Sequence, residues 1–281
     1  MGHDKLRKFA ENETFSCLLQ PSAAEVLADG YANLRDHEVK GRWHPQMFAA
    51  PAPIVLELGC GKGEYTIALA ERNPAANHVG VDIKGARLWK GAKYATQHAL
   101  PNVAFLRARI EFITAYFAPG EVSELWLTFP DPQYKSPNSR LSSPLFLERY
   151  RKFLAPGGIV HLKTDSRYLH EYTKAVCEAN ALEVLACTAD LYSEGPESAV
   201  EGADFIARRP QLREVQTFYE GIFRSQGYKI TYIAFRIRGD APLVQPSAFD
   251  SDYWRSVEGH RTLFGRDTAE TRRRKLAESQ K

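Results

Sequence analysis

The sequence has few cysteines and no long apolar run, and each absence excludes a class of protein. Four of the 281 residues are cysteine, and no two of them have the C-x-x-C spacing of zinc sites, so we expect neither a metal site nor a disulfide framework. No apolar stretch approaches the length needed to span a bilayer. The first residues also lack the apolar region of a signal peptide, so the sequence predicts a cytoplasmic protein without a membrane partner.

Charge of one sign is not in large excess either. The chain contains 37 basic and 34 acidic residues, which gives a net charge of +3. This balance permits a polyanionic partner without requiring one, because only a local basic surface would matter. With 44% hydrophobic residues, the chain can bury one sizeable core.

Composition divides the chain into three parts. We expect an N-terminal arm over residues 1–50, one domain over 51–238, and a C-terminal extension over 239–281 that is extended, partly helical or disordered. The arm favours a helix near 22–34 and a loop at 40–45. Its basic side chains could contact phosphates, although a solvated surface explains them equally well; they are Lys5, Arg7, Lys8, Lys40 and Arg42. The extension ends in a basic run at 272–275.

A glycine-rich stretch at 54–64 organises the central domain. Residues 54–58 predict a strand, Gly59, Gly61 and Gly63 follow at alternate positions, and 65–72 predict a helix. Glycine allows positive φ and close approach to a ligand, and a helix N-terminus presents unpaired N–H groups. The stretch therefore predicts a site for a nucleotide-like ligand.

Two acidic residues near this turn help to distinguish between a dinucleotide site and a site for another nucleotide-like ligand. Dinucleotide sites use G-x-G-x-x-G, whereas here the third glycine comes one residue early. Glu57 precedes the glycines inside the strand, and Asp82 ends the next strand, where it could bind ribose hydroxyls. This set resembles the S-adenosylmethionine (SAM) site of Rossmann-like methyltransferases. A dinucleotide site or a turn without a ligand remains the alternative.

Strands and helices alternate from residue 53 onward. This pattern predicts an α/β fold with parallel βαβ units, namely a Rossmann-like seven-stranded, mostly parallel sheet whose last strand is antiparallel, with helices on both faces. Ser143 is the expected N-cap of a helix that starts at Pro144. Residues 190–210 suggest an insertion or mobile loop. The expected strands are 54–58, 78–82, 103–106, 124–129, 158–163, 183–187 and 229–237, and the expected helices are 65–72, 86–99, 111–117, 144–153 and 168–179.

A second motif follows the fourth strand. Residues 129–132 read F-P-D-P, and Lys135 comes three residues later. Two prolines around Asp131 would hold its carboxylate rigidly at the end of the strand. A stiff turn with a solvated aspartate explains the motif alone, but its place beside the expected ligand site favours a role toward the methyl acceptor.

These motifs together resemble the single-subunit bacterial tRNA (guanine-N7-)-methyltransferases. The resemblance covers about residues 10–237 and rests on E-L-G-C-G-K-G-E, on F-P-D-P with Lys135, on L-K-T-D ending at Asp165, and on Thr217-Phe218-Tyr219-Glu220. It implies a Rossmann-like fold, SAM as donor, and N7 of guanine 46 in the tRNA variable loop as acceptor. It also implies tRNA as partner, no obligate protein partner, and a monomer or homodimer.

The resemblance also implies roles for individual residues. Asp131 would be catalytic and would lie beside both SAM and the guanine. The other SAM contacts would be Glu57, Gly59, Gly61, Gly63, Asp82 and, in place of the acid that many members have there, Arg109. The acceptor side would consist of Lys135, Asp165, Thr217, Phe218, Tyr219 and Glu220. Gln133-Tyr134 and Tyr228 also depart from the common pattern, and Glu111 is out of register with the missing acid.

The implied chemistry needs no strong base. Guanine N7 has an in-plane lone pair, so the site has only to align the reactants and to stabilise positive charge that develops on the purine. Asp131 is the candidate for that stabilisation, and Asp165 and Glu220 could read the guanine N–H donors. Arg140, Arg149, Arg151 and Lys152 could extend a basic surface for RNA. The alternatives are a methyltransferase with another acceptor and a non-catalytic RNA-binding protein.

Overall fold

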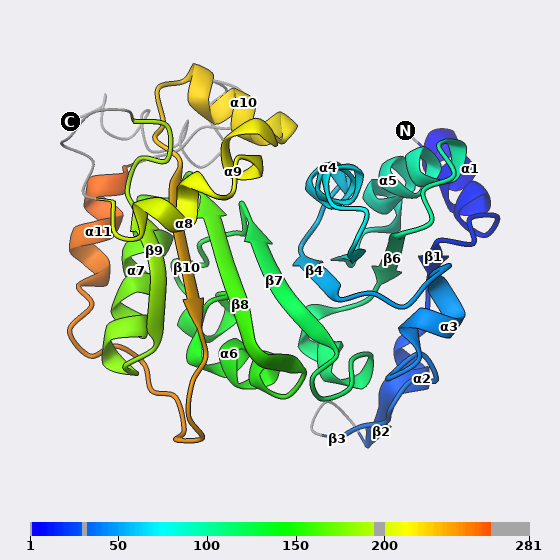
Figure 1. Cartoon of the computed structure of the whole chain (residues 1–281), viewed down its shortest axis with the longest axis horizontal. Helices are drawn as coiled ribbons and strands as arrows, with labels where there is room; N and C mark the ends of the chain where they lie inside the picture. Colours follow the sequence, from blue (N-terminus) through cyan, green and yellow to red (C-terminus); the bar gives the residue numbers. More distant parts are fainter. Residues whose placement is uncertain (1, 30–32, 194–199, 260–281) are drawn as a thin grey trace, which may run out of the picture.

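One large mixed sheet forms the centre of the molecule (Figure 1). The computed structural model describes residues 2–29, 33–193 and 200–259. The strands lie in the order β1-β6-β5-β4-β7-β8-β10-β9, and β10 alone pairs antiparallel, with β8 and with β9. Their bounds are β1 (Leu18–Leu19), β4 (Ile54–Leu58), β5 (Asn77–Asp82), β6 (Val103–Arg107), β7 (Val122–Thr128), β8 (Leu154–Thr164), β9 (Glu183–Thr188) and β10 (Thr231–Arg236).

The predicted fold class is confirmed, and the predicted strand count is one too low. The additional strand is β1, whose two residues pair parallel with Phe105 and Leu106 of β6. A two-residue strand carries no alternation that a sequence pattern could show. The seven other strands lie where the sequence placed them, with ends shifted by a few residues.

Helices cover both faces of the sheet, as predicted. On β7, Leu125 and Leu127 pack toward η1, α6 and α7, whereas Trp126 packs toward α4, α8 and α9. Successive strand side chains point to opposite faces, so a strand covered on both sides is apolar throughout. The helices are α4 (Glu64–Arg72), α5 (Gly85–Gln97), the 3₁₀ helix η1 (Ile110–Ala115), α6 (Pro144–Arg151), α7 (Arg167–Ala179), α8 (Ala203–Ala207) and α9 (Gln211–Glu214). Ser143 caps α6 as predicted.

The N-terminal arm is built into the sheet and the core. α1 (Gly2–Asn12) packs on α5, and Trp43, fully buried in α3 (Trp43–Met47), donates its indole N–H to the Tyr116 carbonyl at 2.8 Å. The helix expected near 22–34 is wrong. α2 (Ala23–Val26) has only four residues, after which β2 (Leu27–Asp29) pairs with β3 (Asn33–Leu34).

One region beyond β9 has more regular structure than the sequence suggested. Glu201 forms an antiparallel bridge with Cys187, and Ile206 of α8 is buried, so the loop expected at 190–210 is wrong for its described part from 200 onward. In the extension, α11 (Ser251–Glu258) follows α10 (Phe218–Ser225) and β10. The basic run at 272–275 lies outside the described residues.

The described residues include no helix with both the length and the apolar character that a bilayer crossing requires.

Candidate functional site

The glycine turn after β4 has the backbone conformation that its sequence predicts. Gly59, Gly61 and Gly63 have φ values of +77°, +58° and +73°, in the region that favours glycine. A Cβ at Gly63 would lie 2.6 Å from the Phe105 ring, so this position excludes larger residues. Gly63 is also the N-cap of α4. The turn therefore packs on β6 while Gly59 remains at a pocket wall.

Asp82 at the end of β5 is fixed against this turn. Its Oδ2 accepts a hydrogen bond from the Gly61 amide at 3.0 Å, and its Oδ1 accepts one from the Lys84 amide at 2.7 Å. These two bonds set the direction of the carboxylate. Asp82 is largely buried, yet it lines the same pocket as Gly59. A fixed carboxylate beside an open glycine turn is suited to a ribose.

The pocket lies at the carboxyl ends of the central parallel strands, where α/β sheets bind ligands. Its volume is about 740 Å³, within the range of small-molecule and cofactor sites. In Figure 1, α10 lies above the ends of β7 and β8. The lining residues are Gly59, Asp82, Arg87, Phe129, Pro130, Asp131, Pro132, Gln133, Tyr134, Ser139, Leu141, Asp165, Ser166, Tyr219 and Phe223.

The pocket brings together five of the residues that the sequence selected. They are Gly59, Asp82, Asp131, Asp165 and Tyr219. The aromatic residues Phe129, Tyr134 and Phe223 were not selected. Phe223 lies four residues after Tyr219 in α10, so helical spacing was a signal that could have found it.

The F-P-D-P loop is held in an unusual backbone conformation. Phe129 and Gln133 have φ values of +50° and +47°, which is uncommon for residues with a side chain. Asp131 Oδ1 accepts a hydrogen bond from the Gln133 amide at 2.9 Å. Strained residues on both sides of an exposed carboxylate at a pocket indicate a position fixed for function.

The buried side chain of Arg140 supports the F-P-D-P loop from the interior of the protein. Its guanidinium is almost fully buried, donates to the Pro132 carbonyl at 3.2 Å and to the Tyr168 hydroxyl, and lies 4.2 Å from the Tyr172 ring centroid. The interpretation of Arg140 as a phosphate contact is therefore wrong, because a cation buried under the loop is not accessible to RNA. Its side chain braces the F-P-D-P loop.

Glu57 lies beneath the turn and does not line the pocket. It is buried, and its two carboxylate oxygens accept hydrogen bonds from the Thr66 hydroxyl on α4 and the Thr128 hydroxyl at the end of β7. Burial raises the pKa of Glu57, and the two threonine hydrogen bonds oppose that rise. Its side chain thus joins α4 to β7, a role that the sequence did not reveal because only folding brings both threonines to it.

Glu220 also points away from the pocket. It is fully buried and forms an ion pair with Lys163 at 2.9 Å, while the Tyr192 hydroxyl donates to it at 2.7 Å. Burial lowers the pKa of Lys163, and Glu220 opposes that shift. Thr217 caps α10, and its hydroxyl oxygen accepts from the Glu220 amide at 3.1 Å. The T-x-x-E quartet is therefore a helix-start pattern in this structure.

Three further predicted residues lie outside the pocket lining. Arg109 is exposed and pairs with Glu111 at 3.2 Å, and Lys135 is exposed in the loop that follows F-P-D-P. Phe218 is 52% exposed, lies 4.8 Å below the Lys62 ammonium, and donates its amide to Glu64 Oε2 at 2.9 Å. The hydrogen bond from Phe218 and the ion pair with Lys90 outweigh burial and lower the pKa of Glu64.

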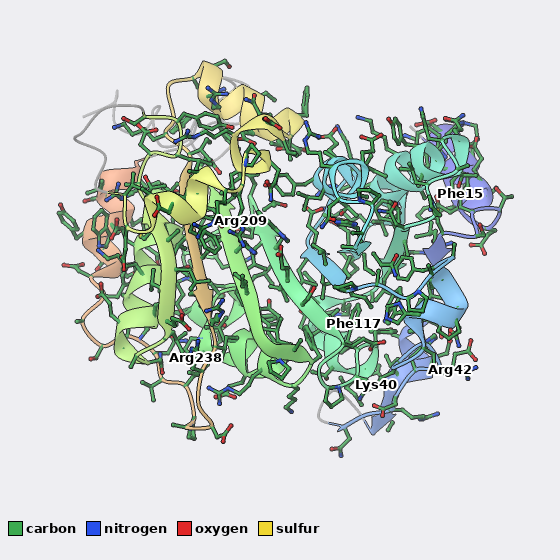
Figure 2. The ribbon with its side chains drawn as sticks, in the orientation of Figure 1. Phe15, Lys40, Arg42, Phe117, Arg209 and Arg238 are labelled. Carbon is green, nitrogen blue, oxygen red and sulfur yellow. The ribbon has the colours of Figure 1, made fainter. Side chains whose placement is uncertain are left out.

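The basic residues suggested as RNA contacts are dispersed. Figure 2 shows Lys40 and Arg42 near the end of the sheet opposite α10, and Lys40 pairs with Asp36 at 2.6 Å. Arg151 pairs with Glu148 at 3.2 Å and donates to the Ala241 carbonyl. These side chains therefore have structural partners or lie away from the pocket.

The sequence is similar to a family of methyltransferases and to several of its members. Residues 51–203 match a family described as "Putative methyltransferase". A tRNA (guanine-N(7)-)-methyltransferase of Christiangramia forsetii is 46% identical over 84% of this chain and 98% of its own length. A tRNA (guanine-N(7)-)-methyltransferase of Bacteroides thetaiotaomicron is 44% identical over 91% of this chain and 95% of its own length. Among solved structures, the 16S rRNA methyltransferase KamB is similar with a TM-score of 0.48 and 21% identity, over 74% of this chain and 97% of that chain.

Proposed function

This chain belongs to the tRNA (guanine-N(7)-)-methyltransferase family, and we propose that it transfers a methyl group to N7 of guanine 46 in the tRNA variable loop. The observation that carries the proposal is the shared pocket of Gly59, Asp82, Asp131 and Asp165. It combines the expected donor residues and the expected acceptor residues at one end of a parallel sheet, where a transfer between two bound molecules is possible.

The methyl donor is SAM, which supplies a methyl group on a sulfonium. The donor side fits it, because Gly59 opens the turn toward the pocket and Asp82 is already oriented by two amides. We assign ribose binding to Asp82 and close backbone approach to Gly59 and Gly61. Glu57 contributes indirectly, since it fixes Thr66 and Thr128 beneath that turn.

The acceptor side consists of carboxylates and rings. Asp131 is held by the Gln133 amide, so its negative charge is preorganised beside the position of the purine and stabilises the positive charge that develops there. Asp165 lies in the same lining and is suited to accept from guanine N–H groups. Tyr219 and Phe223 offer apolar faces on which an unstacked base can rest.

Glu220 and Thr217 act on the acceptor side through α10 in this proposal. The ion pair with Lys163 attaches the helix to β8, and the Thr217 cap fixes its first turn. Tyr219 and Phe223 then point into the pocket from that helix. A tRNA substrate places the reaction in the cytoplasm, and the proposal includes no obligate protein partner, with the chain acting as monomer or homodimer.

The decisive experiment uses labelled SAM and unmodified tRNA. The protein is incubated with both, and the RNA is digested to nucleosides. We expect the label in N7-methylguanosine, with activity that is lost after RNase treatment and decreases as salt rises, because phosphate contacts release counterions. Label in another nucleoside, or methylation of a protein or small molecule that persists after RNase treatment, would identify a different acceptor and contradict the proposal.

A further inference from the structure

One carboxylate of the C-terminal extension accepts hydrogen bonds from residues that line the pocket. Helix α11 lies alongside α7 (Figure 1) and ends at Glu258. Glu258 accepts hydrogen bonds from the Tyr134 hydroxyl at 2.5 Å, from the Ser166 hydroxyl at 2.9 Å and from the Tyr168 amide at 2.6 Å. Three separate donors therefore converge on one carboxylate, and this carboxylate lies outside the methyltransferase motifs.

These donors belong to the two segments that form the acceptor side. Tyr134 lies in the loop that carries Asp131 and Lys135, and it lines the pocket. Ser166 follows Asp165, lines the same pocket, and is the N-cap of α7. A carboxylate at the first turn of a helix is also stabilised by the helix dipole. Glu258 thus joins the acceptor loop to the start of α7.

The extension is also anchored away from Glu258, because several of its residues pack on α7. Phe249 packs edge-on against Tyr168 and Tyr172, with ring centroids 5.3 and 5.4 Å apart. The Tyr172 hydroxyl donates to Gln245 at 2.7 Å, and the Ser251 hydroxyl lies 2.8 Å from that of Tyr168. The carboxylate is therefore presented by a segment that is already packed on α7.

We propose that Glu258 is a positioning residue that holds the acceptor loop and the start of α7 in the arrangement used for methyl transfer. The need for such a restraint is visible in the loop, where the strained residues Phe129 and Gln133 surround an exposed Asp131. Catalytic groups require support from neighbours that lock their geometry. The activity part of this inference rests on the proposed function, whereas the restraint itself does not.

The test compares Glu258→Ala with Asp252→Ala, which removes an exposed carboxylate from the same helix. We expect Glu258→Ala to lower kcat/KM for tRNA by about tenfold while the SAM dissociation constant changes by less than about twofold. Glu258→Gln keeps an acceptor oxygen and should recover most of the loss. Asp252→Ala should stay within about twofold of the wild type.

A second measurement requires no activity. Amide hydrogen exchange of the free protein should become faster at 131–136 and 166–169 in Glu258→Ala and remain unchanged in Asp252→Ala. Unchanged exchange in both segments, or faster exchange across the whole molecule, would overturn the inference. Loss of SAM affinity in parallel with tRNA turnover would also overturn it. If the wild-type protein fails to methylate tRNA, the proposed function fails, and the exchange result still decides the restraint.

Discussion

Asp131 shows how much one side chain depends on the backbone around it. Its carboxylate is exposed, but the Gln133 amide and the two left-handed residues that surround it give it a fixed direction. A charge that is already oriented stabilises a developing cation without reorganisation during the reaction. The residue therefore combines accessibility with rigidity, which a solvated aspartate in a flexible loop would lack.

Replacing this carboxylate tests its role directly. Asp131→Asn keeps an oxygen that can accept from the Gln133 amide but removes the charge. We expect kcat for tRNA methylation to fall at least about tenfold, equivalent to about 1.4 kcal/mol of transition-state stabilisation, while SAM binding persists. Single-turnover methylation and calorimetric titration of SAM measure the two quantities. Turnover close to that of the wild type would remove Asp131 from the mechanism.

A substitution of Glu57 distinguishes a structural role of this residue from a direct contact with SAM. Glu57→Ala leaves the buried hydroxyls of Thr66 and Thr128 without their acceptor, so we expect unfolding free energy to fall by about 2 to 4 kcal/mol. SAM affinity should fall with it, because the turn above loses its support. Urea unfolding and SAM titration give both values. Weaker SAM binding with unchanged stability would show instead that Glu57 contacts SAM directly, as the family motif implies.

At the scale of elements, the ion pair of Lys163 and Glu220 attaches α10 to β8. Removing one partner of a buried pair leaves the other charge uncompensated, so Lys163→Met or Glu220→Gln alone should cost about 3 to 5 kcal/mol. The double variant should be more stable than the less stable single variant. Denaturant unfolding of the two single variants and the double variant measures the coupling between Lys163 and Glu220. A loss of unfolding free energy in the double variant that equals the sum of the two single losses would contradict this prediction.

The double variant also shows whether Glu220 acts by holding α10 in place or by contacting the guanine. If Glu220 acts only by holding α10, restoring stability should restore tRNA turnover in part, because Tyr219 and Phe223 return to the pocket. Turnover that remains absent in a well-folded double variant would assign Glu220 a direct contact with the guanine. The same preparations serve for both measurements.

Elements with a local sequence signal were predictable, and elements without one were not. The strand, turn and helix of β4 and α4 follow from apolar spacing and three glycines, and α6 follows from its cap at Ser143. By contrast, β1 has only two residues and forms by pairing with the edge of β6. Its formation depends on contacts with distant residues, which a single sequence does not display.

The same limit applies to the site. Asp82 and Asp131 were found because each lies at the end of a strand whose carboxyl end must face the ligand side, whereas Asp165 was implied by the family resemblance. The direction of Glu57 and Glu220 was not predictable, because it depends on threonines and a lysine brought close by folding. Glu258 lies beyond the family motifs, so no pattern drew attention to it.

At the scale of the whole molecule, buried histidines such as His78 and His170 make stability depend on pH. Burial lowers the pKa of His78 to about 4, against an opposing effect of Glu124, and burial lowers the pKa of His170 to about 3, assisted by Arg167 and Lys174. As pH falls below about 6.5, the unfolded chain binds protons at these positions and the folded chain does not. Acid therefore favours unfolding.

We expect each histidine to remove about 2 kcal/mol of unfolding free energy between pH 7 and pH 5. Urea unfolding at the two pH values measures the change. His170→Gln cannot take up the proton, so the stability difference between pH 7 and pH 5 should be smaller in this variant by about the contribution of one histidine. An identical difference in variant and wild type would show that His170 is already protonated or accessible in the folded state.

Strand β1 has a consequence for how this protein can be divided. It covers the outer side of β6, where the Phe105 amide donates to the Cys17 carbonyl at 2.7 Å. A fragment that began at residue 51, where composition places a boundary, would leave that row of amides and carbonyls bare. An uncovered strand of this kind is a template for pairing between molecules, so we expect a fragment without the first fifty residues to aggregate more readily than the whole chain.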